Sequence, residues 1–106
     1  MAKYLLDVKY TLDGLKGMVS EGGTARKEAA IKAVESVGGT MEAFYFAFGE
    51  TDVYAIADVP DNVTAAAVAL KLGATGAVAI RTVVLLTPAE VDAAAKVDIA
   101  YRPPGT

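Results

Sequence analysis

Six side chains in this chain of 106 residues are of types that could do chemistry at a shared site: Asp7, Arg26, Tyr45, Asp52, Tyr54 and Arg81. Carboxylates can transfer protons, phenols can polarise a carbonyl group, and an arginine can hold a carboxylate or enolate through two parallel hydrogen bonds. The sequence contains neither cysteine nor histidine, and its carboxylates show no ligand spacing for Mg²⁺ or Ca²⁺. We therefore expect no tightly bound cofactor and no metal.

Asp7 and Arg81 form the most informative pair, because both are expected on neighbouring strands and on the same face of a sheet. One interpretation is a charged anchor in a semi-buried pocket, where Arg81 binds the anionic group of a ligand. The other is a structural ion pair at the seam between two subunits. Asp52 follows a glycine turn, where it could act as a base if burial raised its pKa, or bind the backbone of that turn.

The remaining candidates also have two interpretations each. Tyr45 and Tyr54 could line the same cavity and donate a proton there, or they could be amphipathic core residues with hydroxyls bonded to the backbone. Arg26 opens a helix, where a cation opposes the helix dipole. This position suits contact with an anion or a partner, or a solvated surface arginine.

Eight segments must position these residues, and their patterns alternate between strand and helix. The strands are expected over residues 3–10, 40–48, 52–59 and 78–86, and the helices over residues 11–21, 25–37, 62–72 and 88–96. Thr24 and Asp61 are expected to cap two of the helices, and Thr87-Pro88-Ala89-Glu90 forms a capping box for the last. The order predicts an α+β, ferredoxin-like βαββαβ sandwich with strand order 4-1-3-2, an extra C-terminal helix and an extended arm.

The second strand is apolar on both of its faces. Phe44, Phe46 and Phe48 are expected on one face, opposite a face with Met41, Ala43, Tyr45 and Ala47. Two main helices cover one side of such a sheet, so the other side, roughly 450 Å² in plan, needs separate cover. We expect that side to meet a second copy of the chain, to line a ligand cavity, or both.

The composition of the chain argues against several classes of protein. The net charge is −3 and no cluster of Lys and Arg is present, so no nucleic-acid partner is expected. The N-terminus is charged too early for a signal peptide, and the longest apolar run, residues 65–70, is far shorter than the ~20 residues of a membrane span. A cytoplasmic protein without membrane contact is expected.

Several motifs resemble those of the GYD-domain family, a bacterial family named for its Gly-x-Tyr-Asp turn. They are Arg26, Gly38-Gly39, Tyr45, Gly49-Glu50-Thr51-Asp52, Arg81-Thr82 and Thr87-Pro88-Ala89-Glu90. The resemblance covers about residues 3–96, and the ending at residues 100–105 is also similar to endings in that group. Thr51 stands where the family has its motif tyrosine, so a role of that phenol does not transfer to this chain, whereas Gly49 and Asp52 remain.

The resemblance implies a member of the dimeric α/β-barrel superfamily. That superfamily includes cofactor-independent monooxygenases, muconolactone-type isomerases and haem-dependent enzymes, so the fold alone does not select an activity. We expect a domain over residues 1–96 and an extended arm over residues 97–106. The leading hypothesis is a homo-oligomeric module that binds a small molecule or serves assembly.

Two alternatives stay open. The first is a cofactor-independent isomerase or monooxygenase acting on a small aromatic or enol-type acid, in which Asp7 or Asp52 moves a proton and Arg81 stabilises the anion. The second is an architectural subunit of a ring or shell, clasped by its C-terminal arm.

Overall fold

The computed structural model describes residues 1–106, which form one four-stranded sheet and four helices. The elements in chain order are β1 Ala2–Tyr10, α1 Leu12–Glu21, α2 Gly23–Ser36, β2 Thr40–Phe46, β3 Val53–Val59, α3 Asn62–Ala74, β4 Val78–Leu85 and α4 Pro88–Ala95. The sheet is antiparallel with strand order β2-β3-β1-β4, which confirms the predicted order and the α+β, ferredoxin-like class.

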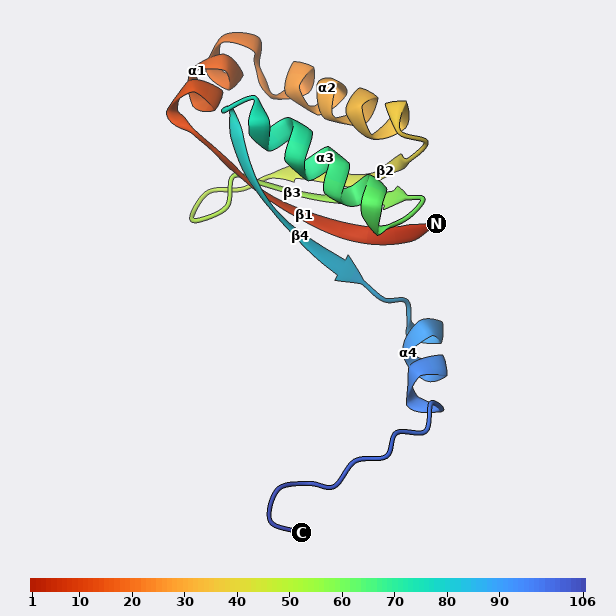
Figure 1. Ribbon diagram of the computed structural model, residues 1–106. Coiled ribbons are helices and arrows are strands. Elements are labelled where there is room, and N and C mark those ends of the chain that lie inside the picture. The colour runs from red at the N-terminus through yellow and green to blue at the C-terminus, as the bar shows by residue number, and fades with distance from the viewer.

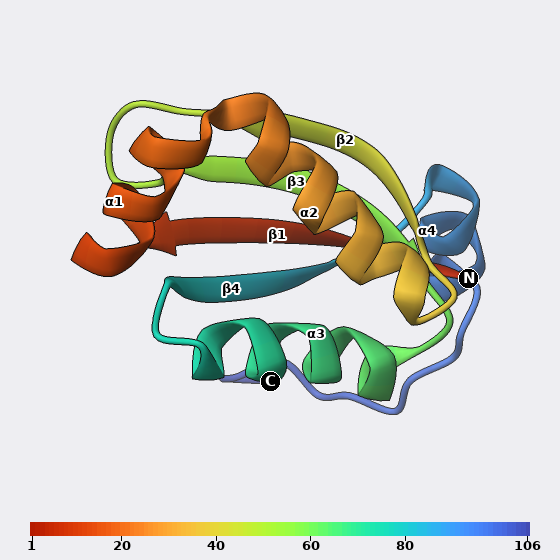
Figure 2. The ribbon, with the colours of Figure 1, turned by 90° about the horizontal axis from the view of Figure 1, so that it is seen from above.

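Three helices cover a single face of this sheet. Figure 1 shows α1, α2 and α3 above the strands, and Figure 2, seen from that side, shows α2 crossing the strands and α3 alongside β4. The opposite face, which we call the open face, carries no helix (Figure 1). The predicted two-layer arrangement is therefore confirmed, with α1 as a third element in the helix layer.

The core lies between the helix layer and the two central strands. Period-two alternation on β3 buries Val53, Ala55, Ala57 and Val59 to 3% exposure or less, while the residues between them face the other way. β1 contributes Tyr4 and Leu6 by the same alternation. The helices complete the core, whose members are Tyr4, Leu6, Val34, Val53, Ala55, Ala57, Val59 and Ala65.

The first helix meets the sheet through a glycine. The side chain of Thr11 accepts a hydrogen bond from the Gly14 N–H and caps α1. Gly14 is buried, and a Cβ there would lie 1.9 Å from the carbonyl oxygen of Ala77. This glycine, which helix propensity alone marks as a weak point, is required for α1 to approach the start of β4.

The predicted N-cap of the second helix is wrong. Gly22, not Thr24, separates α1 from α2, and α2 begins at Gly23. Gly22 adopts a φ of 91°, and its N–H donates to the Met18 carbonyl at 2.7 Å. One left-handed residue therefore ends the first helix and starts the second, which leaves no room for a separate cap.

The predicted faces of the second strand are also wrong in part. The β2–β3 register shifts between Met41 and Ala43, so Glu42 is the extra residue of a β-bulge. The bulge places Met41 on the helix-facing side with Phe44, where both pack against the core. β2 ends at Phe46, and Phe48 is fully exposed in the following loop instead of extending the strand.

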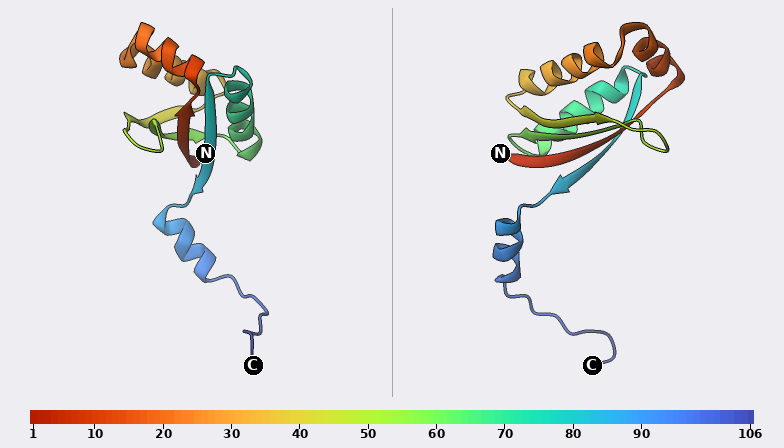
Figure 3. Two further views of the ribbon diagram at one scale, coloured as in Figure 1. Left: turned by 90° about the vertical axis from the view of Figure 1, so that its left-hand side faces the viewer. Right: turned by 180° about the vertical axis from the view of Figure 1, so that it is seen from behind.

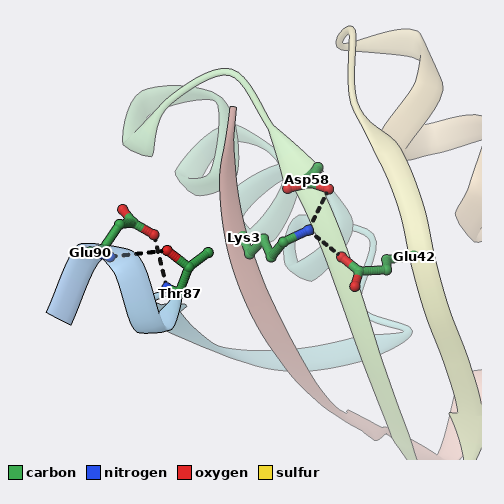
Figure 4. A network of polar contacts seen from close by, with 5 residues as sticks. All are labelled: Lys3, Glu42, Asp58, Thr87 and Glu90. Atoms are coloured by element: carbon green, nitrogen blue, oxygen red, sulfur yellow. Dashed lines mark hydrogen bonds and ion pairs between the residues drawn. The ribbon is translucent and has the colours of Figure 1, made fainter. Parts of the chain in front are cut away.

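The later helix starts were predicted correctly. Asp61 caps α3 by accepting from the Thr64 N–H at 2.8 Å. Thr87 and Glu90 form the reciprocal capping box of α4, drawn in Figure 4. None of the helices has the length and apolar character that crossing a membrane requires.

Candidate functional site

The strand register gathers four of the six candidate residues into one row across the open face. Tyr45 on β2 lies opposite Tyr54 on β3, Tyr54 lies opposite Asp7 on β1, and Asp7 lies opposite Arg81 on β4. The expectation that Asp7 and Arg81 share the open face on neighbouring strands is confirmed. Their functional role stays a prediction.

Asp7 is held from two directions. The Arg81 Nη2 donates to Asp7 Oδ2 at 2.9 Å, and the Thr51 Oγ1 donates to Asp7 Oδ1 at 2.6 Å. The Asp7 side chain is only 13% exposed, whereas that of Arg81 is 83% exposed. The carboxylate is therefore largely enclosed and hydrogen-bonded at both oxygens, while most donors of the guanidinium remain open to a further anion.

These hydrogen bonds determine how Asp7 ionises. The bond from Thr51, and to a smaller extent the bond and charge of Arg81, hold the pKa of Asp7 below its ordinary value, although partial burial acts in the opposite direction. Asp7 is consequently a carboxylate at neutral pH and a weak proton acceptor. This environment suits an electrostatic anchor better than a general base.

A polar pocket of about 290 Å³ opens beside this pair. Its lining consists of Asp7, Lys9, Glu50, Thr51, Ala79, Ile80 and Arg81. Lys9 Nζ donates to the Glu50 carbonyl at 3.0 Å, so the loop after β2 forms one wall. Tyr45 and Tyr54 lie in the same row but do not line this pocket, and both are exposed on the open face.

Asp52 lies apart from the row and binds backbone. Its Oδ2 accepts from the Tyr10 N–H at 2.8 Å, and its own N–H donates to the Val8 carbonyl at 2.9 Å. Its carbonyl accepts from the Ala47 N–H at 2.8 Å. Asp52 therefore ties the β2–β3 loop to the end of β1. Its side chain binds the backbone of β1 and not the backbone of its own turn, which the structural interpretation had expected.

Arg26 lies on the opposite side of the sheet. It belongs to the first turn of α2, where its Nη1 pairs with Glu21 Oε2 at 3.3 Å. It also lines a cavity of about 200 Å³ between α2, α3 and the sheet, in which 16 of the 18 lining residues are hydrophobic. Of the six candidates, Asp7 and Arg81 thus line the polar pocket on the open face and Arg26 lines the apolar cavity on the helix side, while Tyr45, Asp52 and Tyr54 line neither.

The sequence profile of the GYD domain matches residues 4–95 of this chain. The chain belongs to the GYD domain family. The match begins in β1 and ends with α4, so it spans the whole sheet and every helix. No curated protein and no solved structure matches the chain.

Thr51 is the residue of the candidate site that sequence reasoning missed in this GYD domain. It stands at the tyrosine position of the Gly-x-Tyr-Asp turn, and the structure shows it to be the second donor to Asp7. The sequence feature that could have pointed to Thr51 was its position in the Gly-x-Tyr-Asp turn, from which the family takes its name. Its partner could not be inferred, because Thr51 and Asp7 are 44 residues apart and meet only through the fold.

A second group of charges on the open face was also missed. Lys3 Nζ donates to Glu42 Oε2 at 2.6 Å and to Asp58 Oδ2 at 2.9 Å, as Figure 4 shows. These bonds, with the one to Glu42 the largest contribution, raise the pKa of Lys3. Lys3 and Asp58 are register partners, whereas Glu42 reaches them from the bulge. No three acidic side chains of this domain converge in a way that could hold a metal ion.

Proposed function

We propose that this GYD domain is a self-associating module that binds a small molecule. The observation that carries the proposal is the organisation of the open face. A central apolar row of Ala43, Ile56, Leu5 and Val83 crosses all four strands in register. The Asp7–Arg81 pair flanks this row on one side, and the Lys3 cluster flanks it on the other. An apolar centre with a polar rim is the usual anatomy of a protein interface.

The charges of the open face support a second copy of the chain as the partner. Lys3 is paired with Glu42 and Asp58, and Asp7 is paired with Arg81, so each ion pair closes within one chain. A partner can therefore cover the Asp7–Arg81 pair without leaving an unpaired buried charge, which would be costly, whereas the Lys3 cluster has two carboxylates for one ammonium and suits the solvated rim of the interface. In a symmetric interface the same patch of each copy meets the other, so the apolar rows of both copies are buried together.

The helix-side cavity supports a small apolar ligand with an anionic group. Cavities of about 150 Å³ lined by aliphatic and aromatic groups bind molecules of the size of benzene. The cavity here is about 200 Å³, and Arg26 is the single charged residue that lines it. An aromatic or enol-type carboxylate would place its ring among the apolar side chains and its charge beside Arg26.

Binding is better supported than catalysis on the open face. A proton-transferring enzyme would need Asp7 to accept a proton near neutral pH, and the lowered pKa of Asp7 opposes that role. The Asp52 carboxylate already accepts a hydrogen bond from the Tyr10 N–H. Arg81 can still bind an anion in the polar pocket, which a second copy of the chain would enclose.

Self-association is tested by light scattering after size exclusion. The full chain is expected to run as a dimer or a larger closed oligomer at micromolar concentration, and Ile56→Asp, at the centre of the apolar row, is expected to give a folded monomer. Val63→Asp is the matched control, because Val63 is 80% exposed on α3, away from the open face. A monomeric wild type, or an Ile56→Asp variant with unchanged mass, would overturn the assembly half of the proposal.

Ligand binding is tested with benzoate and its neutral analogue benzamide, followed by NMR shift changes of the cavity methyl groups. Benzoate is expected to perturb Val34 and Ile80, and Arg26→Gln should weaken benzoate at least fivefold while leaving benzamide unchanged. Ala33→Phe should fill the cavity and abolish both effects, whereas Ala66→Phe on the exposed side of α3 should not. An Arg26→Gln variant that binds benzoate as tightly as the wild type does would remove the anionic part of the proposal.

A further inference from the structure

The C-terminal segment 86–106, which contains α4 and the tail predicted as an extended arm over residues 97–106, is the one part of the chain that buries nothing against the rest. From here on the whole segment 86–106 is called the arm. Its apolar side chains Val91, Val97, Ile99 and Tyr101 are 51–79% exposed, and α4 contains no buried residue. The radius of gyration is 17.0 Å, whereas a compact chain of this length is expected near 13 Å. The arm therefore extends away from the body, as Figure 1 shows.

The arm is nevertheless built as an ordered element. The capping box of Thr87 and Glu90 satisfies backbone donors at the start of α4, and Pro88 stands in its first turn. A helix of eight residues is marginal in water unless it packs against something. Hydrogen bonds within the segment thus define α4 as a helix, but no other part of the same chain covers its apolar side chains.

The direction of the arm indicates where that surface is. Helices α1, α2 and α3 lie on one side of the sheet, and α4 with the following tail extends on the other side (Figures 1 and 3). This is the side of the open face. A second body packed against the open face would therefore lie alongside the arm.

We infer that the arm of each chain crosses onto a second copy packed against its open face, and that the two copies exchange their arms. This inference rests on the proposed self-association and adds the element that clasps it. α4 spans about 12 Å, and ten extended residues span up to about 33 Å. This length exceeds the roughly 20 Å of a sheet and a helix layer, so the arm can reach the helices of the second copy.

A second copy is favoured over return of the arm onto its own chain. The helix layer of the same chain lies across the sheet from the arm, and the arm would compete with the partner if it covered its own open face (Figure 3). Exchange between two identical chains buries the apolar side chains of both arms and leaves the symmetric sheet contact intact.

The test compares two equally exposed positions. Ile99 in the arm is 79% exposed and Val63 on α3 is 80% exposed, so aspartate at either position disturbs the fold of a single chain very little. Sedimentation is expected to show that Ile99→Asp raises the dimer dissociation constant at least tenfold, whereas Val63→Asp leaves it within twofold. An Ile99→Asp variant with the wild-type constant would overturn the arm inference while leaving the open-face dimer standing, and a monomeric wild type would overturn both.

A crosslinking measurement separates exchange from return to the same chain. A photoreactive benzoylphenylalanine at Tyr101 is expected to give a product of twice the chain mass, and peptide mapping should place the junction in the other copy. Mixing isotopically heavy and light chains identifies such junctions directly. Crosslinks confined to single chains, at a concentration where the protein is dimeric, would overturn the exchange.

Discussion

The two faces of the sheet contain similar apolar side chains but differ in what covers them. On β3 alone, Val53 and Ala55 are 1% and 2% exposed under the helices, while Tyr54 between them is 44% exposed on the open face. The helix-covered face is purely apolar over the central strands, whereas the open face interleaves apolar residues with internally closed ion pairs. The first is buried within one chain, and the second is the face that we propose another molecule covers.

The largest expected contrast comes from placing one aspartate on each face. Val53→Asp should destabilise the fold by about 3–5 kcal/mol, because it buries an unpaired charge. Ile56→Asp should cost no more than about 1 kcal/mol in the monomer, where the open face is in contact with water. Urea unfolding at a protein concentration below the dimer dissociation constant measures the free energy of unfolding of both variants. Equal losses of that free energy would show that the two faces are equally buried within a single chain.

The next contrast measures how closely the helix layer is fitted. Gly14→Ala should cost about 1–3 kcal/mol, because its Cβ would meet the Ala77 carbonyl oxygen and push α1 away from the sheet. Gly17→Ala in the same helix has no neighbour within 4 Å and should stabilise by up to about 1 kcal/mol. Thermal unfolding compares them, and a shift of the same sign in both variants would mean that the contact at Gly14 is not limiting.

The smallest effect concerns the ionisation of Asp7 on the open face. Its lowered pKa means that the folded state releases the proton more readily than the unfolded chain does, for which the ordinary value is 3.8. The resulting stability is present at neutral pH and is lost as the pH falls from about 5 through the folded pKa. Thr51→Val should raise the pKa of Asp7 and make this acid loss shallower.

Carbon-detected NMR titration of the Asp7 carboxyl group, together with unfolding curves between pH 2 and pH 7, measures that change. Thr82→Val on β4 is the control, because Thr82 alternates with Arg81 and points to the other side of the sheet. A titration midpoint of Asp7 that is the same in Thr51→Val and wild type would show that the hydrogen bond from Thr51 does not set its ionisation.

Part of the site could be predicted from sequence because strand alternation is a local property. The shared face of Asp7 and Arg81 follows from a period of two and from strand order, and both were correct. The separation of Arg26 from the other candidates was not predicted, because a position at the start of a helix does not determine which side of the sheet it serves. Thr51 and Glu42 were missed because a loop and a bulge bring them to their partners.

The sequence by itself determined the order of elements, the α+β class and the caps at Asp61 and Thr87. It also determined that the sheet has an apolar face that the helices do not cover. These properties depend on neighbours a few residues apart, whose spacing is written directly in the chain. Only the tertiary structure decided that Glu42 forms a bulge, that Gly22 joins two helices, that Thr51 holds Asp7, and that the arm extends on the side of the open face. Those features depend on contacts between distant segments, which exist only after the sheet has fixed their register.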